Sequence, residues 1–330
     1  MARSAVLCGL GSYLPTRVVT NADIAAELDT TDEWITTRTG IRQRHVVDPE
    51  QCTSGLAVAA GREALDSAGL DIVDYVVVAT TTPDRLCPAT GPTVAARLGL
   101  GTVPAFDISA VCSGFLYGLQ SGRALIGAGL AETVLLIGAE SFTSLVDPAD
   151  RGTRPIFGDG AGAVVLRAGA ADEPGAILAV TLHSDGTEAD LITVEGGGAR
   201  ARLGGDPTPA YIRMQGRSTF VTAVTRMEEV TRHTLTEVGW TVNEVDRIAG
   251  HQANARILHS LAKHLGLPAE AAITHLREVG NTAGASIPLA LHHGQRTGLL
   301  RPGHRVVLPA FGAGATWGAA ALTWPNLKQP

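Results

Sequence analysis

Apolar runs of strand length alternate with helix-like patterns along this chain, and the alternation occurs twice. The predicted strands span residues 5–14, 75–82, 105–109, 133–139 and 161–166, and then 176–183, 247–251 and 305–309. The predicted helices span residues 54–69, 91–100 and 113–130, and then 218–238, 255–265 and 282–297. Such alternation is typical of a mostly parallel sheet covered by helices. The sequence therefore predicts an α/β fold, with a Gly-, Pro- and charge-rich surface loop at 195–209.

Composition excludes several classes of protein. With 330 residues, of which 45% are hydrophobic, the chain can build one large or two fused domains. The net charge is −6 and Lys and Arg are dispersed, which disfavours nucleic acid as a partner. Gly9, Gly11 and Pro15 interrupt the N-terminal apolar run, so we expect neither a signal peptide nor a membrane span. The four cysteines lack paired or metal-ligand spacing, which predicts a reducing cytoplasm and no metal site.

Cys112 lies between a predicted strand and a predicted helix. A thiol in the first turn of a helix faces unpaired N–H groups and the positive end of the macrodipole, which favour the thiolate. Cys112 is therefore a candidate nucleophile. A buried structural cysteine would show the same local pattern.

Two glycine-rich segments have different contexts. Residues 158–162 (Gly-Asp-Gly-Ala-Gly) run into a strand, whereas a dinucleotide-binding loop opens a helix. They predict a tight turn close to another element. Residues 311–318 (Phe-Gly-Ala-Gly-Ala-Thr-Trp-Gly) follow a predicted strand and would expose bare backbone N–H groups.

His251 and Asn281 each stand where a helix is predicted to begin. Taken singly, they are explained by a hydrogen-bonded structural histidine and by a helix cap. With residues 110–114 (Ala-Val-Cys-Ser-Gly) and the C-terminal glycine-rich turn, they resemble the condensing enzymes of the thiolase superfamily, most nearly β-ketoacyl-acyl carrier protein synthase III. Further matching motifs, in order, are 9–15 (Gly-Leu-Gly-Ser-Tyr-Leu-Pro), 32–35 (Asp-Glu-Trp-Ile), 38–41 (Arg-Thr-Gly-Ile), 157–162 (Phe-Gly-Asp-Gly-Ala-Gly) and 251–254 (His-Gln-Ala-Asn).

The resemblance implies a thiolase-like, five-layered αβαβα fold made of two duplicated βα halves. Residues 1–170 would carry the nucleophile, and residues 171–330 would carry the histidine and the asparagine. It also implies a cytoplasmic homodimer without a permanently bound cofactor. Acyl-CoA and malonyl-acyl carrier protein would be the substrates.

The same resemblance assigns roles to residues. Cys112, His251 and Asn281 would be catalytic, and the backbone N–H groups of Cys112 and Ala313 would form the oxyanion hole. Relatives often have a third glycine where this chain has Ala313. Cys112 would accept an acyl group, and His251 and Asn281 would stabilise the enolate formed when the malonyl group loses carbon dioxide. A neutral Asn281 suits condensation, because a carboxylate there would repel the enolate.

Binding residues also follow from the resemblance. The coenzyme A channel would contain Trp34, Arg38, Arg151, Gly216, Phe220, Ala253 and Asn254. Arg256 and Lys263, seven positions apart on one predicted helix, would dock the acidic carrier protein. Surface ion pairs and core packing are the alternative explanation for these residues.

Cys87 would reach across the dimer to the floor of the partner's acyl pocket. Relatives with a bulky aromatic side chain there tend to use acetyl primers. The smaller Cys87 therefore predicts longer or branched primers.

Other functions remain open. The product could initiate fatty acid synthesis or prime a polyketide pathway. A transferase that moves the acyl group from coenzyme A to a hydroxyl or amine without decarboxylation is an alternative. A non-catalytic scaffold subunit is another, although such a subunit is expected to lack the nucleophile.

Overall fold

The computed structural model of this chain describes residues 3–205 and 208–327, and it contains two five-stranded sheets.

The first sheet contains both parallel and antiparallel strand pairs. Five strands form this sheet in the order β1-β7-β6-β4-β5, namely β1 (Arg3–Tyr13), β7 (Gly160–Ala170), β6 (Thr133–Glu140), β4 (Tyr75–Ala79) and β5 (Ala105–Ile108). β4 pairs in parallel with β5 and β6, whereas β7 pairs antiparallel with β1 and β6.

The second sheet is mainly antiparallel. Its strands are β11 (Arg247–Ile248), β12 (Arg305–Val307), β14 (Thr316–Thr323), β13 (Ala310–Gly312) and β8 (Ile177–Ser184). β14 pairs antiparallel with β12, β13 and β8, and only β11 and β12 run parallel. The prediction of a mostly parallel sheet was therefore wrong. Alternation shows that strands and helices follow one another, but not in which direction each strand runs. β7 follows β6 after the segment 141–159, β14 follows β13 after a turn at 313–315, and both run antiparallel to the strand before them.

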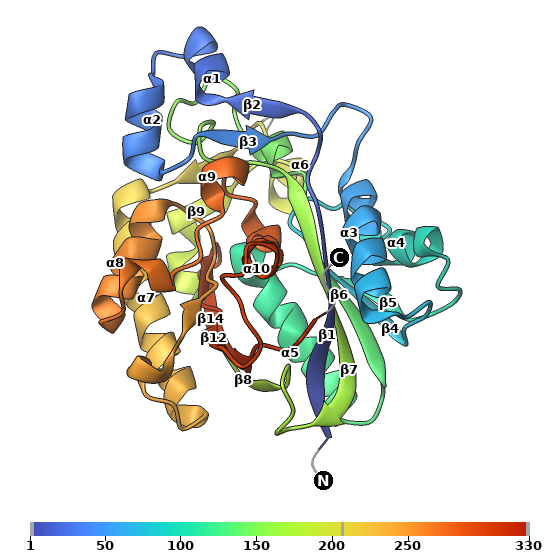
Figure 1. The fold of residues 1–330 in the computed structure, drawn as a ribbon. Helices are drawn as coiled ribbons and strands as arrows, with labels where there is room; N and C mark the ends of the chain where they lie inside the picture. The colour runs from blue at the N-terminus through green and yellow to red at the C-terminus, as the bar shows by residue number, and fades with distance from the viewer. Residues whose placement is uncertain (1–2, 206–207, 328–330) are drawn as a thin grey trace.

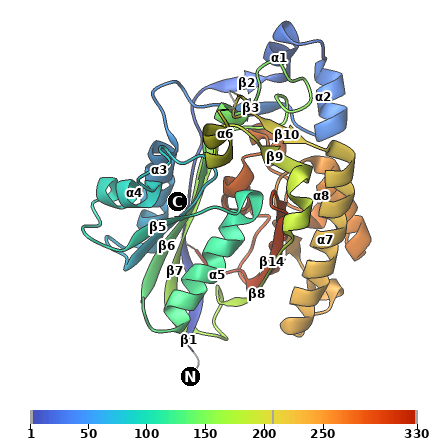
Figure 2. The same cartoon turned by 180° about the vertical axis from the view of Figure 1, so that it is seen from behind.

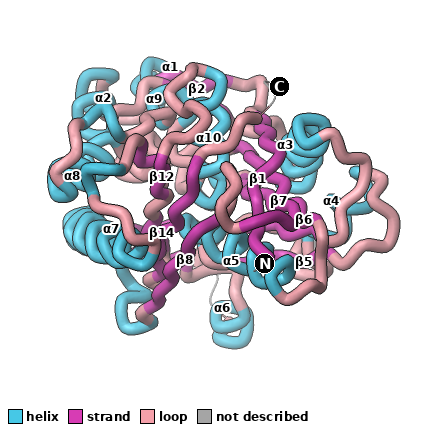
Figure 3. The backbone as a smooth tube through the Cα atoms, turned by 60° about the horizontal axis from the view of Figure 1, so that its bottom comes forward, coloured by secondary structure: helices cyan, strands magenta, loops and turns pink. Residues whose placement is uncertain are grey.

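Helices separate and cover the two sheets, which gives the five-layered αβαβα fold of the thiolase class (Figure 1). α3 (Thr53–Ala68) and α4 (Thr90–Leu98) cover the outer face of the first sheet. α5 (Gly114–Gly127) and α10 (Ser286–Arg296) lie between the sheets. Figures 2 and 3 show α5 between the strands of the two sheets. α7 (Gly216–Glu237) packs on the outer face of the second sheet, beside α8 (Ala255–Leu265).

Shorter elements lie around one end of the layers. They are β2 (Val18–Thr20), α1 (Asn21–Glu27), α2 (Asp32–Thr39), β3 (Gln43–His45), β9 (Ile192–Val194), α6 (Ala199–Gly204), β10 (Ile212–Met214) and α9 (Leu276–Val279). α6 lies in the segment that we expected to be loop throughout. The predicted division at residue 170 coincides with the end of β7, and the division itself stays a prediction.

The largest apolar cluster fills the space between the sheets. Phe115 and Leu119 on α5 and Leu291 on α10 are at most 1% exposed there, together with Leu136 of β6 and Ala320 of β14. Burial of this surface stabilises the layered arrangement at roughly 25 cal/mol per Å² of apolar area. Among residues 3–205 and 208–327, no helix is both long and apolar enough to cross a membrane.

Close backbone contacts bring the segment around Asn281 against the first sheet. A Cβ atom on Gly158 would lie 2.3 Å from the carbonyl oxygen of Val279, and one on Gly162 would lie 2.8 Å from the Leu289 nitrogen. The predicted close approach to another element is thus confirmed, but the predicted tight turn is not, because residues 160–162 already lie in β7. On β6, a Cβ atom on Gly138 would lie 2.5 Å from the Gly284 carbonyl oxygen. These contacts require glycine because the opposing atoms belong to backbone, which cannot rotate away.

Gly138→Ala should therefore destabilise the protein by about 1–3 kcal/mol, because the added methyl group overpacks a backbone contact. Gly55→Ala is a matched control, since Gly55 lies in α3 and a Cβ atom there would meet nothing within 4 Å. This control should raise stability by up to about 1 kcal/mol through helix propensity. Urea unfolding measures both variants, and equal stabilities for the two would contradict the close-contact account.

Candidate active site

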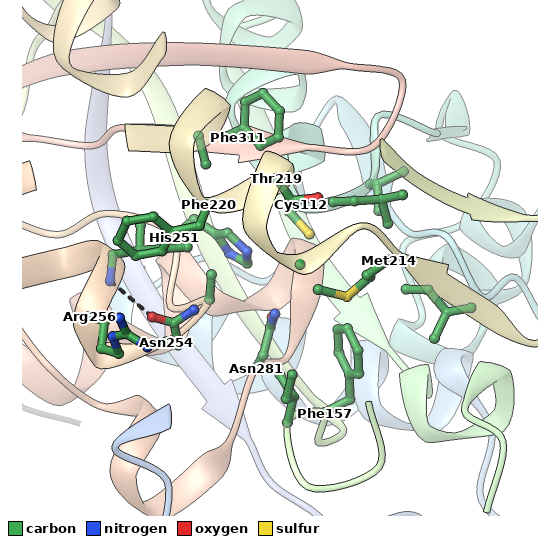
Figure 4. Close-up of a pocket in the computed structure, with 18 of the residues that line it drawn as sticks. Cys112, Phe157, Met214, Thr219, Phe220, His251, Asn254, Arg256, Asn281 and Phe311 are labelled. Carbon is green, nitrogen blue, oxygen red and sulfur yellow. Dashed lines mark hydrogen bonds between the residues drawn. The ribbon is translucent and has the colours of Figure 1, made fainter. Parts of the chain in front are cut away.

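Cys112 lies in a strained turn between a strand and a helix. β5 ends at Ile108, a 3₁₀ turn spans Val111–Ser113, and α5 begins at Gly114. Cys112 thus precedes α5 rather than lying in its first turn. Val111 has a φ of 47°, a left-handed conformation that costs a β-branched residue about 1–3 kcal/mol and is concentrated at functional sites. The turn directs the Cys112 sulfur into a cavity (Figure 4).

The electrostatic surroundings of Cys112 differ from the expectation. Burial and, to a smaller extent, the nearby Glu140 carboxylate raise the pKa of the Cys112 thiol to about 12, although its own backbone N–H lowers it. The resting side chain is therefore a neutral thiol, and the predicted thiolate is wrong for the unliganded protein. Desolvation outweighs the helix dipole because Cys112 is only 7% exposed. Nothing in the local sequence indicated Glu140 as a neighbour.

Glu140 ends β6 and is fully buried. Its carboxylate accepts hydrogen bonds from the Thr81 N–H at 3.1 Å and from the Thr82 hydroxyl at 2.7 Å. The Gly284 N–H, close to Asn281 in sequence, also points to it at 3.4 Å. Burial raises the pKa of Glu140 to about 7 although these donors lower it. Glu140 therefore links β6 to two loops beside Cys112.

His251 follows β11 and is held from both sides. Its backbone N–H donates to the Pro309 carbonyl at 2.8 Å, and its ring Nδ1 lies 2.7 Å from the Ser286 hydroxyl oxygen. That oxygen also accepts from the Gln252 N–H at 3.3 Å. Among the described residues, Nδ1 is the acceptor that the structure offers to the Ser286 proton, so we assign Ser286 as the donor to Nδ1. The ring proton then resides on Nε2. Burial lowers the pKa of His251 to about 4, so the ring is neutral at pH 7.

Asn281 is oriented by its own turn. Its side-chain Oδ1 accepts the Ala283 N–H at 2.9 Å, which leaves the NH₂ group as a donor toward the cavity. Its backbone donates to Ile156 and accepts from Gly158, at 2.9 and 3.0 Å. Ala283 has a φ of 43°, so this turn is also strained. Asn281 and His251 therefore both present neutral N–H donors.

Cys112, His251 and Asn281 all line one cavity of about 430 Å³. In Figure 4 the Cys112 sulfur, the His251 ring and the Asn281 amide point toward one another. Five of the seven predicted channel residues line the same cavity, namely Arg38, Gly216, Phe220, Ala253 and Asn254. Arg256, which was predicted to dock the carrier protein, lines it too. The remaining wall is mainly apolar, with Phe142, Ile156, Phe157, Met214, Met227 and Phe311, which sequence reasoning did not single out.

Basic and aromatic side chains gather near this cavity. The guanidinium groups of Arg38 and Arg151 lie 5.3 and 5.1 Å from the centre of the Trp34 ring. Arg217, at the start of α7, lines the cavity with Arg38 and Arg256 and was missed, because it belongs to none of the matched motifs. Four of the predicted binding residues do not line the cavity: Trp34, Arg151, Lys263 and Cys87. Lys263 is exposed in the last turn of α8, and Cys87 is exposed on a loop.

The C-terminal glycine-rich turn packs directly on the nucleophile. A Cβ atom on Gly312 would lie 2.9 Å from the Cys112 nitrogen. The next residue, Ala313, has an N–H group without an acceptor among the described residues. Ala313 lines a second cavity of about 350 Å³, which shares Val111 and Phe142 with the first. The turn therefore lies against the backbone of Cys112, and the role of the Ala313 N–H stays a prediction.

Comparison with known proteins identifies the arrangement. The family model described as 3-oxoacyl-[acyl-carrier-protein] synthase III matches residues 106–186, and the model of its C-terminal part matches residues 235–324. The chain is 57% identical to β-ketoacyl-[acyl-carrier-protein] synthase III 3 of Streptomyces coelicolor, over 98% of both chains. It is 53% identical to β-ketoacyl-[acyl-carrier-protein] synthase III of Pseudomonas aeruginosa, over 99% of this chain and 98% of the relative.

Solved structures of the same family are similar to this chain along almost its whole length. 3-Oxoacyl-(acyl carrier protein) synthase III from Pseudomonas aeruginosa has a TM-score of 0.94 at 52% identity, over 98% of this chain and 99% of that one. The priming β-ketosynthase of the R1128 polyketide biosynthetic pathway has a TM-score of 0.93 at 34% identity, over 99% and 98%. This chain therefore belongs to the β-ketoacyl-[acyl-carrier-protein] synthase III family of condensing acyltransferases.

Proposed function

We propose that this protein condenses an acyl-CoA primer with malonyl-acyl carrier protein through an acyl-Cys112 intermediate. The observation that carries the proposal is one cavity lined by a thiol, an imidazole and a carboxamide, all neutral at pH 7. The thiol is the nucleophile, and the other two groups donate hydrogen bonds. Backbone N–H groups of Cys112 and Ala313 complete the site.

The first step transfers the acyl group. The Cys112 sulfur attacks the thioester carbon, and the tetrahedral oxyanion is stabilised by the two backbone N–H groups. The C–S bond to coenzyme A breaks, and the departing sulfur takes up a proton in exchange for the one lost by the Cys112 thiol. A neutral thiol does not repel the phosphates of an approaching coenzyme A molecule.

The second step forms the carbon–carbon bond. The bond between the malonyl methylene carbon and the carboxylate breaks, carbon dioxide leaves, and the electron pair forms an enolate. His251 Nε2–H and the Asn281 NH₂ group hold the enolate oxygen. The enolate carbon attacks acyl-Cys112, the C–S bond breaks, and the Cys112 thiolate takes a proton from solvent.

Coenzyme A fits the basic and aromatic entrance. Its adenine would stack on Trp34 after Arg151 moves away, because that guanidinium now lies over the indole ring. The Arg151 side chain is half exposed, and within the described part of the chain its ion pair is with exposed Asp29 at 3.5 Å. Moving the guanidinium group therefore costs little free energy. Arg38 then contacts the phosphates, and the apolar tunnel holds the pantetheine.

The carrier protein would dock on Arg217, Arg256 and Lys263, whose charges complement an acidic partner. The protein would act as a cytoplasmic homodimer, in which the exposed loop containing Cys87 reaches the partner's acyl pocket. The small Cys87 side chain supports primers longer or more branched than acetyl.

Fatty acid initiation and polyketide priming share this chemistry. The similarity to the R1128 priming ketosynthase supports the second role beside the first. Acyl transfer to a hydroxyl or amine forms no enolate, so it does not require the two neutral donors His251 and Asn281. This reaction is therefore disfavoured.

Replacing Asn281 tests the condensation directly. Asn281→Ala removes one enolate donor, so release of labelled carbon dioxide from malonyl-carrier protein and formation of the 3-ketoacyl product should fall about 100-fold or more. Acylation of Cys112 by acyl-CoA should change less than threefold, because the oxyanion hole is backbone. Mass spectrometry and scintillation counting measure the two steps separately.

Cys112→Ala is the matched control, because it removes acyl transfer without touching the enolate donors. An Asn281→Ala variant that lost acylation and condensation in parallel would contradict the assigned roles. Full formation of the 3-ketoacyl product by the same variant would show that Asn281 is not needed to hold the enolate.

The reactivity of Cys112 should depend steeply on pH. Because its thiol pKa is raised to about 12, the thiolate fraction and the alkylation rate should rise about tenfold per pH unit from about pH 6 to pH 9. Above about pH 7, where Glu140 is charged, Glu140→Gln should react faster than the wild type. Peptide mapping separates Cys112 from the exposed Cys52 and Cys87. An alkylation rate that levels off near pH 7 would show that the pKa of the Cys112 thiol is not raised.

A further inference from the structure

Two hydroxyl groups connect the nucleophile loop to the C-terminal glycine-rich turn. The Thr316 hydroxyl lies 3.1 Å from the Ala110 carbonyl oxygen and 3.0 Å from the Ala313 carbonyl oxygen. The Ser113 hydroxyl donates to the Thr316 carbonyl at 2.9 Å, and the two hydroxyl oxygens are 3.3 Å apart. Ala110 and Ser113 flank Cys112 on either side, so the contacts enclose the nucleophile.

Among the described residues, no backbone–backbone hydrogen bond joins these two segments. Within residues 3–205 and 208–327, the hydrogen bonds that join the 108–114 segment to the 310–316 segment are those of the Ser113 and Thr316 hydroxyls. β13 pairs with β14, and β14 also pairs with β12 and β8, but neither strand pairs with the nucleophile loop. Apolar packing alone does not specify the direction of an N–H group. The hydroxyls therefore determine how the two segments face each other.

Ser113 and Thr316 lie where the two oxyanion donors must be aligned. The Cys112 N–H belongs to one segment and the Ala313 N–H to the other, and Gly312 brings the backbones into contact. An oxyanion hole works only when both donors lie about 3 Å from the same developing oxygen. A displacement of about 1 Å between the segments is enough to cost a large factor in rate.

We propose that Thr316 is a positioning residue that aligns the backbone N–H groups of Cys112 and Ala313, with Ser113 as its partner. The proposal rests on the proposed function, because it assumes that an acyl thioester reacts at Cys112. Thr316 is not itself a catalytic residue, since its hydroxyl is directed at backbone carbonyl oxygens.

A positioning role at the oxyanion hole affects some steps and not others. Attack on acyl-CoA and attack on acyl-Cys112 both pass through a tetrahedral oxyanion. Loss of carbon dioxide from the malonyl group instead develops charge on the enolate oxygen, which faces His251 and Asn281. A merely structural role would slow all three steps together.

Thr316→Val tests the proposal, because valine keeps the shape and removes the hydroxyl. The rate of acyl-Cys112 formation at saturating acyl-CoA should fall about ten- to a hundredfold, with little change in the acyl-CoA concentration that gives half the maximal rate. Carbon dioxide release from malonyl-carrier protein by the unacylated enzyme should stay within about twofold. Intact-protein mass and labelled carbon dioxide measure the two rates.

Three further variants make the outcome decisive. Thr316→Ser keeps the hydroxyl and should restore acylation to within a few fold of the wild type. Ser113→Ala should show the same selective loss, and it replaces Thr316→Val if the latter does not fold. Thr323→Val is the matched control at the other end of β14, where the hydroxyl makes no hydrogen bond among the described residues, and it should acylate normally.

The opposite pattern is expected from Ser286→Ala, which releases His251 Nδ1 and should slow carbon dioxide release more than acylation. The positioning role is overturned if Thr316→Val acylates at the wild-type rate, or if it slows both measured steps equally. Failure of the wild-type enzyme to acylate Cys112 at all would instead refute the proposed function.

Discussion

Contact between backbones holds the candidate site together. Gly138 meets Gly284, Gly158 meets Val279, and Gly312 meets Cys112, each at a spacing that admits no side chain. Through these contacts the Asn281 turn lies on the first sheet, and the C-terminal turn lies on the nucleophile. The strained residues Val111 and Ala283 occur in the same loops, and close packing of this kind is what maintains such strain. The proposed chemistry depends on this crowding, because it places the C-terminal turn against the backbone of Cys112.

The same crowding makes the reacting groups neutral. Burial raises the pKa of Cys112 and lowers that of His251, so neither group is charged at rest. A neutral imidazole with its proton on Nε2 and a carboxamide oriented by its own turn are suited to hold an enolate oxygen without competing for its proton. Glu140, buried beneath the site with a raised pKa, lets the protein keep a carboxyl group near the nucleophile with little repulsion below about pH 7.

Much of the fold class and the lining of the candidate site could be predicted from the sequence. The strand and helix patterns located most elements, and motif order brought Cys112, His251 and Asn281 together. Strand direction could not be predicted, because periodicity does not encode the connections after which β7 and β14 run antiparallel to the strands before them. The thiolate expectation failed because it used the local helix and took no account of the burial of Cys112, nor of Glu140, which comes from another strand. The contacts of Ser286, Arg217 and Thr316 could not be predicted because their partners are distant in sequence.

In the proposed reaction, Cys112 carries the acyl group from acyl-CoA to the malonyl-derived enolate. The most direct measurement is the time course of intact-protein mass after mixing with a panel of acyl-CoA thioesters, followed by malonyl-carrier protein. An acyl mass that maps to Cys112 and disappears as carbon dioxide and a 3-ketoacyl-carrier protein form is the predicted result. An acyl mass that persists until an alcohol or amine is supplied, or that never maps to Cys112, would contradict the account.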